Sequence, residues 1–467
     1  MKIFSLAYPA MALTLAGCAS LTPDGGLTAV NDLLGPRISQ TVQRDDADTA
    51  SRQAQLAALL AQPLSVDNAV RIALRNNKML QAALADLGVS EADLVQAGTM
   101  ANPRFSFGRL SGDSGVEIDR AVLFNLGALL TMPMRKAIEE RRFQQAQLQT
   151  ALQVVRLATD TRRAYFAAVA ARQTAAYMQQ VEQATQASAE LAQRMAKAGN
   201  WSKLDQAREQ VFHAEVSAQV LRASHNATAT RENLVRQMGL SDEHSALKLP
   251  ERLPDLPAQV QPVSDMETTA LAQRLDVQAA KLETEATAKN LGLTRSTRFV
   301  NVLEAGYQNK SASGQSRSDG YEVELSLPLF DWGSARNRRA EAIYMRSLQR
   351  TASVAVQARS EVRESYSAYQ ASFTIAHRYR DEIVPLRKRV SEEVLLRYNG
   401  MLASVFELLS DARAQIISIN ATIETQRDFW IAESELQFAL HGGSRSGFVS
   451  SLREPAGKLP AADSGAH

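Results

Sequence analysis

The sequence predicts a mainly α-helical protein with a small β part, in which one structural plan occurs twice. Long stretches place apolar or small residues at alternating spacings of three and four, as helices do when they pack in a coiled coil. Two shorter regions contain strand-like segments, one of which alternates between apolar and polar residues. Three sequence patterns recur in the same order roughly 200 residues further along the chain, which indicates an internal duplication.

The bulk composition suits a folded protein, with 45% hydrophobic and 22% charged residues in 467. The 52 basic and 50 acidic residues leave a net charge of +2. This balance argues against nucleic acid as a partner, because nucleic-acid-binding proteins usually carry a strongly basic face. After the N-terminal segment, no stretch approaches 18 continuous apolar residues, so we expect any membrane crossing to use closed β-structure.

Residues 1–17 predict a secretory signal peptide, in which Lys2 precedes an apolar run. They lead into Leu15-Ala16-Gly17-Cys18, which resembles the lipobox of bacterial lipoproteins. We therefore expect a covalent lipid on Cys18, the only cysteine of the chain. The alternative is an ordinary signal peptide with an incidental cysteine. By resemblance to bacterial lipoproteins, Ala19 favours sorting to the outer membrane.

The recurring patterns divide the chain into two repeats, 63–240 and 266–440. Residues 241–265 between them are predicted to be an extended linker, because four prolines within 248–262 exclude helix. Residues 18–62 form a lipidated, polar leader, and 441–467 form a flexible tail rich in small residues. The recurring patterns are 73–83 with 270–280, 131–134 with 326–329, and 204–208 with 409–413.

Each repeat is predicted to hold two long antiparallel helices, over about 136–238 and about 335–440. Ascending helices of about 55–60 residues would span roughly 80–90 Å, a length that suits a fibre, a spacer or a tube wall. The helices reverse at tip turns containing Gly199 in the first repeat and Tyr398 and Gly400 in the second, and Pro385 predicts a bend. The predicted packing seam of the first repeat is Leu148, Leu152, Val155, Thr159, Arg162, Phe166 and Val169, returning through Leu204, Ala207, Val211, Ala214, Ala218 and Leu221. That of the second repeat is Ala355, Ala358, Val362, Ser365, Tyr369, Ser372, Ala376, Tyr379, Ile383, Leu386 and Val390, returning through Val405, Leu409, Ala412, Ile416, Ile419, Ile423 and Trp430.

Strands are predicted over about 103–132 and about 298–329. In residues 321–327 the apolar set is Tyr321, Val323, Leu325 and Leu327, and the polar set includes Glu322 and Glu324. This alternation is typical of a membrane barrel strand, so the two glutamates are candidates for a barrel lumen. The partner strands are expected at 299–307, across a loop from 309 to 320, and at 104–108 and 122–126, across a loop from 111 to 115.

Four strands cannot close a transmembrane barrel, because the smallest known type needs about eight. Lipid does not tolerate the open edge of a sheet. If these strands span a membrane, several chains must therefore build one barrel together. The alternative is two soluble β-hairpins that cap a coiled coil.

These motifs resemble those of the TolC-like outer-membrane efflux family, in its lipoprotein branch. The resemblance covers about residues 63–440, but 134–137 depart from the aromatic-Asp-Trp-Gly pattern expected at the first strand-to-helix transition. The resemblance rests on Leu327-Pro328-Leu329-Phe330-Asp331-Trp332-Gly333 with Arg336, Arg338 and Arg339, Tyr398-Asn399-Gly400, Glu407-Leu408-Leu409, Asp411-Ala412-Arg413, Ala198-Gly199, Leu204-Asp205, Arg208, Asn76-Asn77 and Asn102-Pro103.

The resemblance implies a homotrimer with a shared 12-stranded β-barrel and a long α-helical periplasmic tunnel. Such a protein is the outer-membrane channel of a tripartite efflux system, fed by an inner-membrane pump through a periplasmic adaptor. Its localisation would be the outer membrane, lipid-anchored. The alternative is a structural periplasmic coiled-coil lipoprotein without channel activity.

The resemblance also implies acidic rings near the tunnel tip, which constrict the pore and attract cations. Glu407 is the leading candidate for such a ring, and Asp411 and Asp205 are further gate candidates. Three symmetry-related carboxylates would raise the local negative potential. The alternative is that these residues belong to a solvated helix face.

The sequence shows no catalytic site and no metal site. None of the six histidines pairs with another at metal-ligand spacing, and no thiol lies nearby. There is no phosphate-binding loop, dinucleotide fingerprint or nucleophile elbow. We therefore expect no cofactor beyond the lipid on Cys18, and no enzymatic activity.

Overall fold

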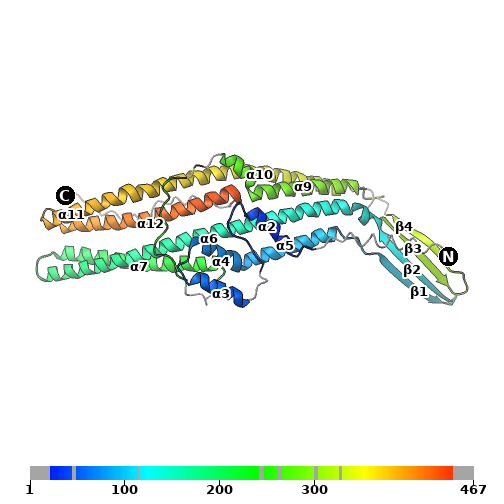
Figure 1. The fold of residues 1–467 in the computed structure, drawn as a ribbon, viewed down its shortest axis with the longest axis horizontal. Coiled ribbons are helices and arrows are strands. Elements are labelled where there is room, and N and C mark those ends of the chain that lie inside the picture. The colour runs from blue at the N-terminus through cyan, green and yellow to red at the C-terminus, as the bar shows by residue number, and fades with distance from the viewer. Residues whose placement is uncertain are drawn as a thin grey trace. The chain divides into compact units, whose positions relative to one another are not determined.

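The computed structural model describes residues 21–44, 49–113, 115–240, 247–260, 262, 265–298, 303–325 and 329–444 (Figure 1). The chain divides into two compact units: unit 1 comprises Met1–Pro36, Ala82–Ala151 and Leu275–Val356, and unit 2 comprises Arg37–Gln81, Leu152–Arg274 and Gln357–His467. Within the described residues, no helix is both long and apolar enough to span a membrane. The strands are β1 (Arg104–Gly112), β2 (Gly115–Asn125), β3 (Leu303–Ala312) and β4 (Ser318–Leu325), and the helices are α2 (Leu27–Leu34), α3 (Thr49–Leu60), α4 (Val66–Asn76), α5 (Lys78–Ala97), α6 (Leu126–Lys197), α7 (Lys203–Gln237), α8 (Met266–Gln273), α9 (Leu275–Ser296), α10 (Ser334–Arg378), η2 (Tyr379–Ile383), α11 (Val384–Asn399) and α12 (Val405–His441).

Unit 1 contains an antiparallel sheet whose strands lie in the order β1-β2-β3-β4 (Figure 1). The first repeat supplies the β1–β2 hairpin and the second repeat supplies the β3–β4 hairpin. Pairing of residues 117–125 with 304–312 joins the two hairpins into one sheet. In the described part of the chain, β1 and β4 are therefore edge strands. Residues 299–302 and 326–328 of the predicted strands lie outside the described residues.

The first strand-to-helix transition lies earlier than the sequence predicts. β2 ends at Asn125 and α6 begins at Leu126, so the strand predicted at 122–126 is confirmed up to Asn125, while the predicted strand region extends too far, to about residue 132. The side-chain oxygen of Asn125 accepts a hydrogen bond from the backbone N–H of Ala128 at 2.6 Å, which caps the helix. The apolar residues that follow Asn125 therefore continue a capped helix, and the departing segment 134–137 lies inside it.

The second hairpin extends further than the sequence predicts. β3 continues to Ala312 and β4 begins at Ser318, so most of the predicted loop from 309 to 320 is strand. Asn309 is only 3% exposed, donates to the Asp319 carboxylate and accepts from Arg120 at 3.2 Å. Pairs of polar residues on neighbouring strands thus stabilise this part of the sheet. Because the residues are polar, the sequence pattern predicted a loop here.

Unit 2 is built from long helices, and the seams predicted for the ascending helices are buried in part. On α10, the seam from Ala358 to Ala376 is buried at every predicted position. On α11 the predicted seam is wrong, because Leu386 and Val390 are 52% and 45% exposed. Phe166 on α6 stacks on Trp430 of α12 with ring centroids 5.6 Å apart, which joins the two repeats. Just before Pro385, the π-helical turn η2 interrupts the ascending helix of the second repeat, so the irregularity lies where the proline predicts one.

The duplication is visible in how each returning helix ends. Asn77 lies between α4 and α5, and its side-chain N–H donates to the carbonyl of Gln237 at the end of α7 (3.1 Å). Arg274 lies between α8 and α9 and donates to the carbonyl of Ala439 near the end of α12 (3.4 Å). Arg274 is fully buried and its charge is balanced by Glu361 at 2.9 Å. The first recurring pattern, 73–83 with 270–280, therefore marks equivalent structural positions.

The proline-rich linker has no helix or strand over 247–260 and packs closely on unit 2. Four of its leucines, Leu247, Leu249, Leu253 and Leu256, are buried in the core. The carbonyl of Pro254 accepts hydrogen bonds from the side chains of Gln426 (2.6 Å) and Trp430 (3.0 Å). The linker is thus extended, as predicted, and is fixed along its length.

The leader also docks on the protein, which its polar composition does not indicate. The backbone N–H and the hydroxyl of Thr22 both donate to the carboxylate of Glu91, at 2.7 and 2.6 Å. Glu91 is 4% exposed, and α2 buries Val30 and Leu34 in unit 1. The Asp24 carboxylate caps the start of α2, and its hydrogen bonds to Thr28 hold its pKa well below the usual range.

Candidate functional site

The sheet has one apolar and one polar face. Directly paired residues in an antiparallel sheet point to the same side, and successive residues alternate. Val122, Tyr307 and Tyr321 form one such row, and the Tyr307 and Tyr321 rings lie 6.5 Å apart. Tyr321 is 91% exposed. The exposed large apolar residues of this face are Phe105, Phe107, Phe124, Tyr307, Tyr321, Val323 and Leu325.

The opposite face of the sheet carries charged residues, with Leu110 of β1 as an exposed apolar residue near the hairpin turn. Glu322 and Glu324, the lumen candidates, are exposed on this face. The predicted alternation of the strand is therefore confirmed over its described residues, while the role of the two glutamates stays a prediction. Two ion pairs cross the strands here: Arg104–Glu304 at 3.4 Å and Lys310–Asp119 at 4.0 Å.

Exposed apolar side chains also mark the transition from β4 to α10. Leu329, Phe330 and Trp332 are 69%, 98% and 55% exposed. The turn that presents them is held by Asp331, whose carboxylate accepts from the backbone N–H of Gly333 at 2.8 Å. Gly333 has φ of +69°, which favours glycine. Aromatic residues of this kind form girdles at the edges of membrane barrels.

The two helical hairpins of unit 2 reverse at tip turns of the same construction. Ser202 caps α7 by accepting from the backbone N–H of Asp205 at 3.1 Å, and Ser404 caps α12 by accepting from Glu407 at 3.2 Å. In the second turn Glu407 also accepts from the backbone N–H of Ser404 at 3.2 Å, which completes a capping box. Asp205 and Glu407 therefore occupy equivalent positions.

A left-handed residue precedes each cap, but it differs between the tips. It is Gly199 in the first turn, with φ of +80°, and Met401 in the second, with φ of +56°. The predicted turn residue Gly400 has φ of −81°, so it does not supply this conformation. The carbonyl of Tyr398 accepts from the N–H of Met401 at 3.0 Å and helps to close the turn.

Beyond each cap, a carboxylate bonds back to the ascending helix. Glu209, which is 1% exposed, accepts from the Ser188 hydroxyl at 2.8 Å. Asp411 is half-buried and accepts from the Ser391 hydroxyl. Glu209 was not predicted, because the recurring pattern aligns 204–208 with 409–413. Matching the two capping serines instead would have aligned Glu209 with Asp411.

The three gate candidates thus have local partners in the single chain. Glu407 is exposed and belongs to the capping box, and Asp411 is bonded to α11. Asp205 accepts from the Ser202 hydroxyl at 2.6 Å and lies 3.6 Å from Arg208. These contacts give each carboxylate a structural role, and the gating role stays a prediction.

A cavity of about 230 Å³ lies between the two tips. The Arg208 guanidinium lies over the Phe406 ring at 5.5 Å, and that of Arg413 lies over Phe212 at 4.2 Å. Cation–π contacts of this kind hold the two hairpins together in unit 2. The lining residues are Trp201, Asp205, Arg208, Glu209, Ser404, Val405, Phe406 and Leu409.

The returning helix α7 buries a different face from the predicted one. Phe212, Val216 and Val220 pack against Met178 of α6. The predicted seam is uncovered: Leu204, Val211 and Leu221 are 61%, 56% and 72% exposed. The prediction that this seam packs within the chain is therefore wrong, and α7 presents an apolar stripe at helical spacing to the outside.

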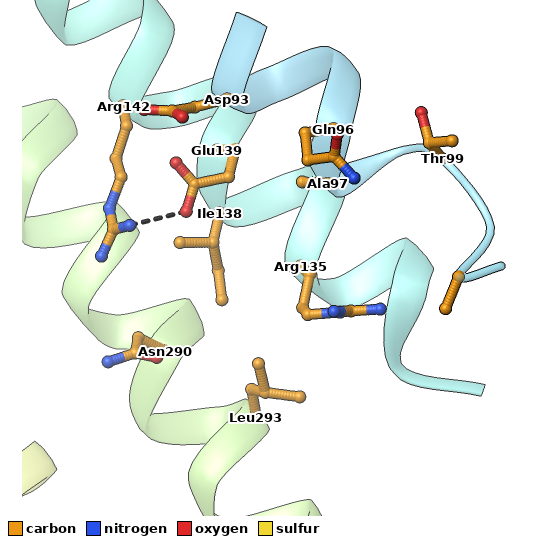
Figure 2. Close-up of a pocket in the computed structure, with 11 residues that line it drawn as sticks. Asp93, Gln96, Ala97, Thr99, Arg135, Ile138, Glu139, Arg142, Asn290 and Leu293 are labelled. Carbon is orange, nitrogen blue, oxygen red and sulfur yellow. Dashed lines mark hydrogen bonds and ion pairs between the residues drawn. The ribbon is translucent and has the colours of Figure 1, made fainter. Parts of the chain in front are cut away.

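A larger cavity of about 540 Å³ lies between α5, α6 and α9 of unit 1 (Figure 2). Its charges are balanced in number, because two arginines, Arg135 and Arg142, and two carboxylates, Asp93 and Glu139, line it. Arg142 binds Glu139 at 2.6 Å, and Arg135 donates to a backbone carbonyl of α6 at 2.9 Å. Across the described residues, no group of three potential metal-ligating side chains occurs. Neither cavity presents a recognisable catalytic or metal-binding set.

Four carboxyls on α12 are shielded from water within unit 2: Glu435 is buried, and Glu424, Asp428 and Glu433 are half-buried. Burial raises the pKa values of Glu424, Asp428, Glu433 and Glu435 above their usual range. Arginines oppose this effect in part, as Arg163 does at 2.9 Å from Glu435.

Comparison with known proteins identifies this fold. Residues 268–383 match the family model of the outer membrane efflux protein. No curated protein sequence matches the chain. A membrane protein from Pseudomonas aeruginosa has the same fold, with a TM-score of 0.72, 19% identity and coverage of 82% of this chain and 92% of that one.

Two structures of outer membrane channels have the same fold. The CmeC outer membrane channel of Campylobacter jejuni gives a TM-score of 0.71 and 16% identity, over 89% of this chain and 93% of that one. The open state of the MtrE outer membrane channel of Neisseria gonorrhoeae gives 0.68 and 16%, over 81% and 89%. The predicted fold class, mainly helical with four strands per chain, is confirmed.

Proposed function

We propose that this chain is the outer-membrane channel component of a tripartite efflux system and acts as a homotrimer. The match of residues 268–383 to the outer membrane efflux protein family supports a role in efflux. In the proposed function, three chains share a 12-stranded barrel in the outer membrane and a helical tunnel in the periplasm. Substrates from an inner-membrane pump enter the tunnel through a periplasmic adaptor and pass through it passively.

The observation that carries this proposal is the two-faced sheet with two edge strands. Aromatic and aliphatic side chains are exposed on one face, and carboxylates on the other. A lipid-facing band and a water-facing lumen require this division. The open edges of β1 and β4 must be paired in lipid, and β4 of one copy can pair with β1 of the next.

The exposed stripe on α7 supports the oligomer. Residues at helical spacing that a chain leaves uncovered are suited to packing against another helix. Leu204, Val211 and Leu221 would then be buried between copies. We expect Leu221→Ser to weaken the trimer and Val216→Ser, on the buried face, to destabilise the single chain instead.

The second tip is the proposed contact for the adaptor. Met401 and Leu402 are 94% and 82% exposed, and Phe406 beside them is 55% exposed. Apolar side chains at this level of exposure mark protein contact sites. We expect Leu402→Ser to abolish export in cells while leaving channel currents of the purified protein unchanged.

We also infer that Cys18 carries the lipid anchor. Cys18 lies outside the described residues, but Thr22, four residues further on, is held by Glu91. An anchor on Cys18 would therefore be tied directly to unit 1. Labelling of cells with radioactive palmitate should mark the protein and fail with Cys18→Ser.

Planar-bilayer recording tests the channel. The purified full-length protein should migrate as a heat-sensitive oligomer on a gel and conduct ions. A monomer that forms no pores would contradict the proposal and favour a structural coiled-coil lipoprotein of the periplasm.

The same recording tests the gate candidates. Glu407→Gln keeps the capping box, because glutamine serves at that position as glutamate does, but removes the charge. If three Glu407 carboxylates form a ring, this variant should alter conductance or cation block, as should Asp411→Asn. Unchanged currents in both variants would remove the gate assignment. Glu190→Gln, on an exposed part of α6, is the matched control.

A further inference from the structure

The apolar face of the sheet changes character toward the hairpin turns. β2 passes directly into α6, so the hairpin ends, at Asp113 and at residues 313–317, lie at the other end of the sheet (Figure 1). Counted toward the turns, the rows on this face are apolar up to the row that holds Val122, Tyr307 and Tyr321. The next row contains Arg120, Asn309 and Asp319 beside Phe107 of β1, and the row after it contains Arg109, Ile118 and Ser311. Charged and polar side chains therefore join the apolar ones from the row of Arg120 onward, and these rows are called the polar zone.

This polar zone carries surplus positive charge. Asp319 is the acidic residue of its strands; it accepts from Asn309 and from the Tyr307 hydroxyl at 2.7 Å, and it lies 3.8 Å from Arg317. A second carboxylate, that of Asp113, is exposed in the turn after β1. Against these two carboxylates stand three guanidinium groups, those of Arg109, Arg120 and Arg317. Arg109 is exposed and forms no ion pair with any residue of the described ranges.

The arginines are spaced to share a ligand. Arg109 pairs with Ile118 in the ladder, so Arg120, two residues further along β2, is its diagonal neighbour. Diagonal neighbours on one face of a sheet are about 7–8 Å apart, within reach of long side chains. In the proposed trimer, β4 of one copy would lie beside β1 of the next and bring Arg317 to the same seam.

The opposite face at the same height has no such surplus. Lys310 is the basic residue there, and it pairs with Asp119 at 4.0 Å. Lys310 pairs with Ser318 in the ladder, one position along from the pair of Asn309 and Asp319, so it lies at the height of the polar zone. The positive charge is thus confined to the face that, in the proposed channel, contacts lipid.

We propose that Arg109, Arg120 and Arg317 form a binding site for a lipid of the outer leaflet that carries phosphate monoesters on a sugar headgroup. The inference rests on the proposed membrane orientation of the sheet. Acyl chains would pack on the apolar rows, and the guanidinium groups just above them would bind the phosphates. Arginine binds phosphate through paired N–H donors. A phosphate monoester carries about −1.5 to −2 charges at neutral pH and so matches several arginines better than a singly charged diester does.

Lipid titration of the full-length protein tests this site. Channel currents in phosphatidylcholine bilayers first establish that the protein is a folded channel; their absence would count against the proposed function itself. Binding of bis-phosphorylated lipid A to the oligomer in detergent is then compared with dephosphorylated lipid A and phosphatidylglycerol. We expect at least about tenfold tighter binding of the phosphorylated form, from two or more charge-assisted hydrogen bonds.

The variant Arg109→Gln, Arg317→Gln should lose this tenfold preference while its currents persist. Lys310→Gln removes one positive charge from the other face and should keep the preference. Equal binding of phosphorylated and dephosphorylated lipid A, equal binding of phosphatidylglycerol, or the same loss in Lys310→Gln would overturn the site.

Discussion

The two tips of unit 2 share a construction and differ in what they expose. Both end the ascending helix with a left-handed residue, and both begin the returning helix with a serine cap. The first tip has glycine at the left-handed position and buries its carboxylate, Glu209. The second tip has Met401 there, almost fully exposed, and half-buries Asp411.

This difference indicates that the tips of the two repeats have different roles. A non-glycine residue in the left-handed region costs roughly 1–2 kcal/mol, so the second turn is less favourable locally than the first. The second tip also leaves Leu402 and Phe406 in water. We infer that the first tip mainly stabilises the hairpin pair, while the second gives up stability to present an apolar surface.

The largest expected difference concerns the buried carboxylates. Ser188→Ala removes the hydroxyl that binds Glu209 and leaves a buried carboxylate without that donor, at a cost of about 2 kcal/mol. The equivalent Ser391→Ala should cost well under half as much, because water reaches the half-buried Asp411. Urea unfolding of both variants provides the comparison. Equal losses would show that the carboxylates are not in different environments.

The two N-caps should contribute equally to stability, and each should contribute less than the Ser188–Glu209 hydrogen bond. Ser202→Ala and Ser404→Ala each remove one N-cap hydrogen bond, which is worth about 1 kcal/mol. Amide hydrogen exchange should speed up in the first turn of α7 in one variant and of α12 in the other. Ser224→Ala, in the interior of α7, is a control that should leave both turns protected. Unchanged exchange at both turns would contradict the capping roles.

Substitutions at the two left-handed positions should change the free energy of unfolding in opposite directions. Gly199→Ala introduces strain and should destabilise the protein by about 1 kcal/mol. Met401→Gly relieves strain and should stabilise it by about 0.5 kcal/mol after the entropy cost of glycine. If the exposed methionine serves adaptor docking, Met401→Gly should also weaken export despite the gain in stability. A loss of stability in Met401→Gly would contradict the comparison.

The smallest effect is expected from pH. Because burial raises the pKa values of Glu424, Asp428, Glu433 and Glu435 in the folded state, their ionisation opposes folding. The stability they contribute is present below their unfolded pKa values and is lost as pH rises through the folded ones. The unfolding temperature should therefore be somewhat higher near pH 5 than near pH 8, and exchange along α12 should slow on acidification. Faster exchange along α12 at low pH would contradict this account.

The sequence predicted the fold from features that depend on local pattern alone. Alternation around Tyr321 and the heptad seam of α10 were both confirmed, because each records which side of an element is apolar. The same pattern does not record which molecule covers the apolar side. For this reason the seam from Leu204 to Leu221 was predicted to pack within the chain, although the chain leaves it exposed.

Other features depend on contacts between residues far apart in the sequence. The leader appears polar, yet Thr22 is fixed by Glu91, which lies 69 residues away. The extension of β3 and β4 depends on Asn309 meeting Arg120 and Asp319, a contact that composition does not indicate. Glu209 was missed because its importance comes from burial against Ser188.

Spin-label accessibility along β4 in reconstituted liposomes tests most directly that lipid covers the apolar face of the sheet. A label at Val323 should collide with oxygen dissolved in lipid, and a label at Glu322 or Glu324 with a water-soluble nickel complex. Accessibility to the nickel complex at all three positions would show that the strand lies in water and would contradict the shared barrel.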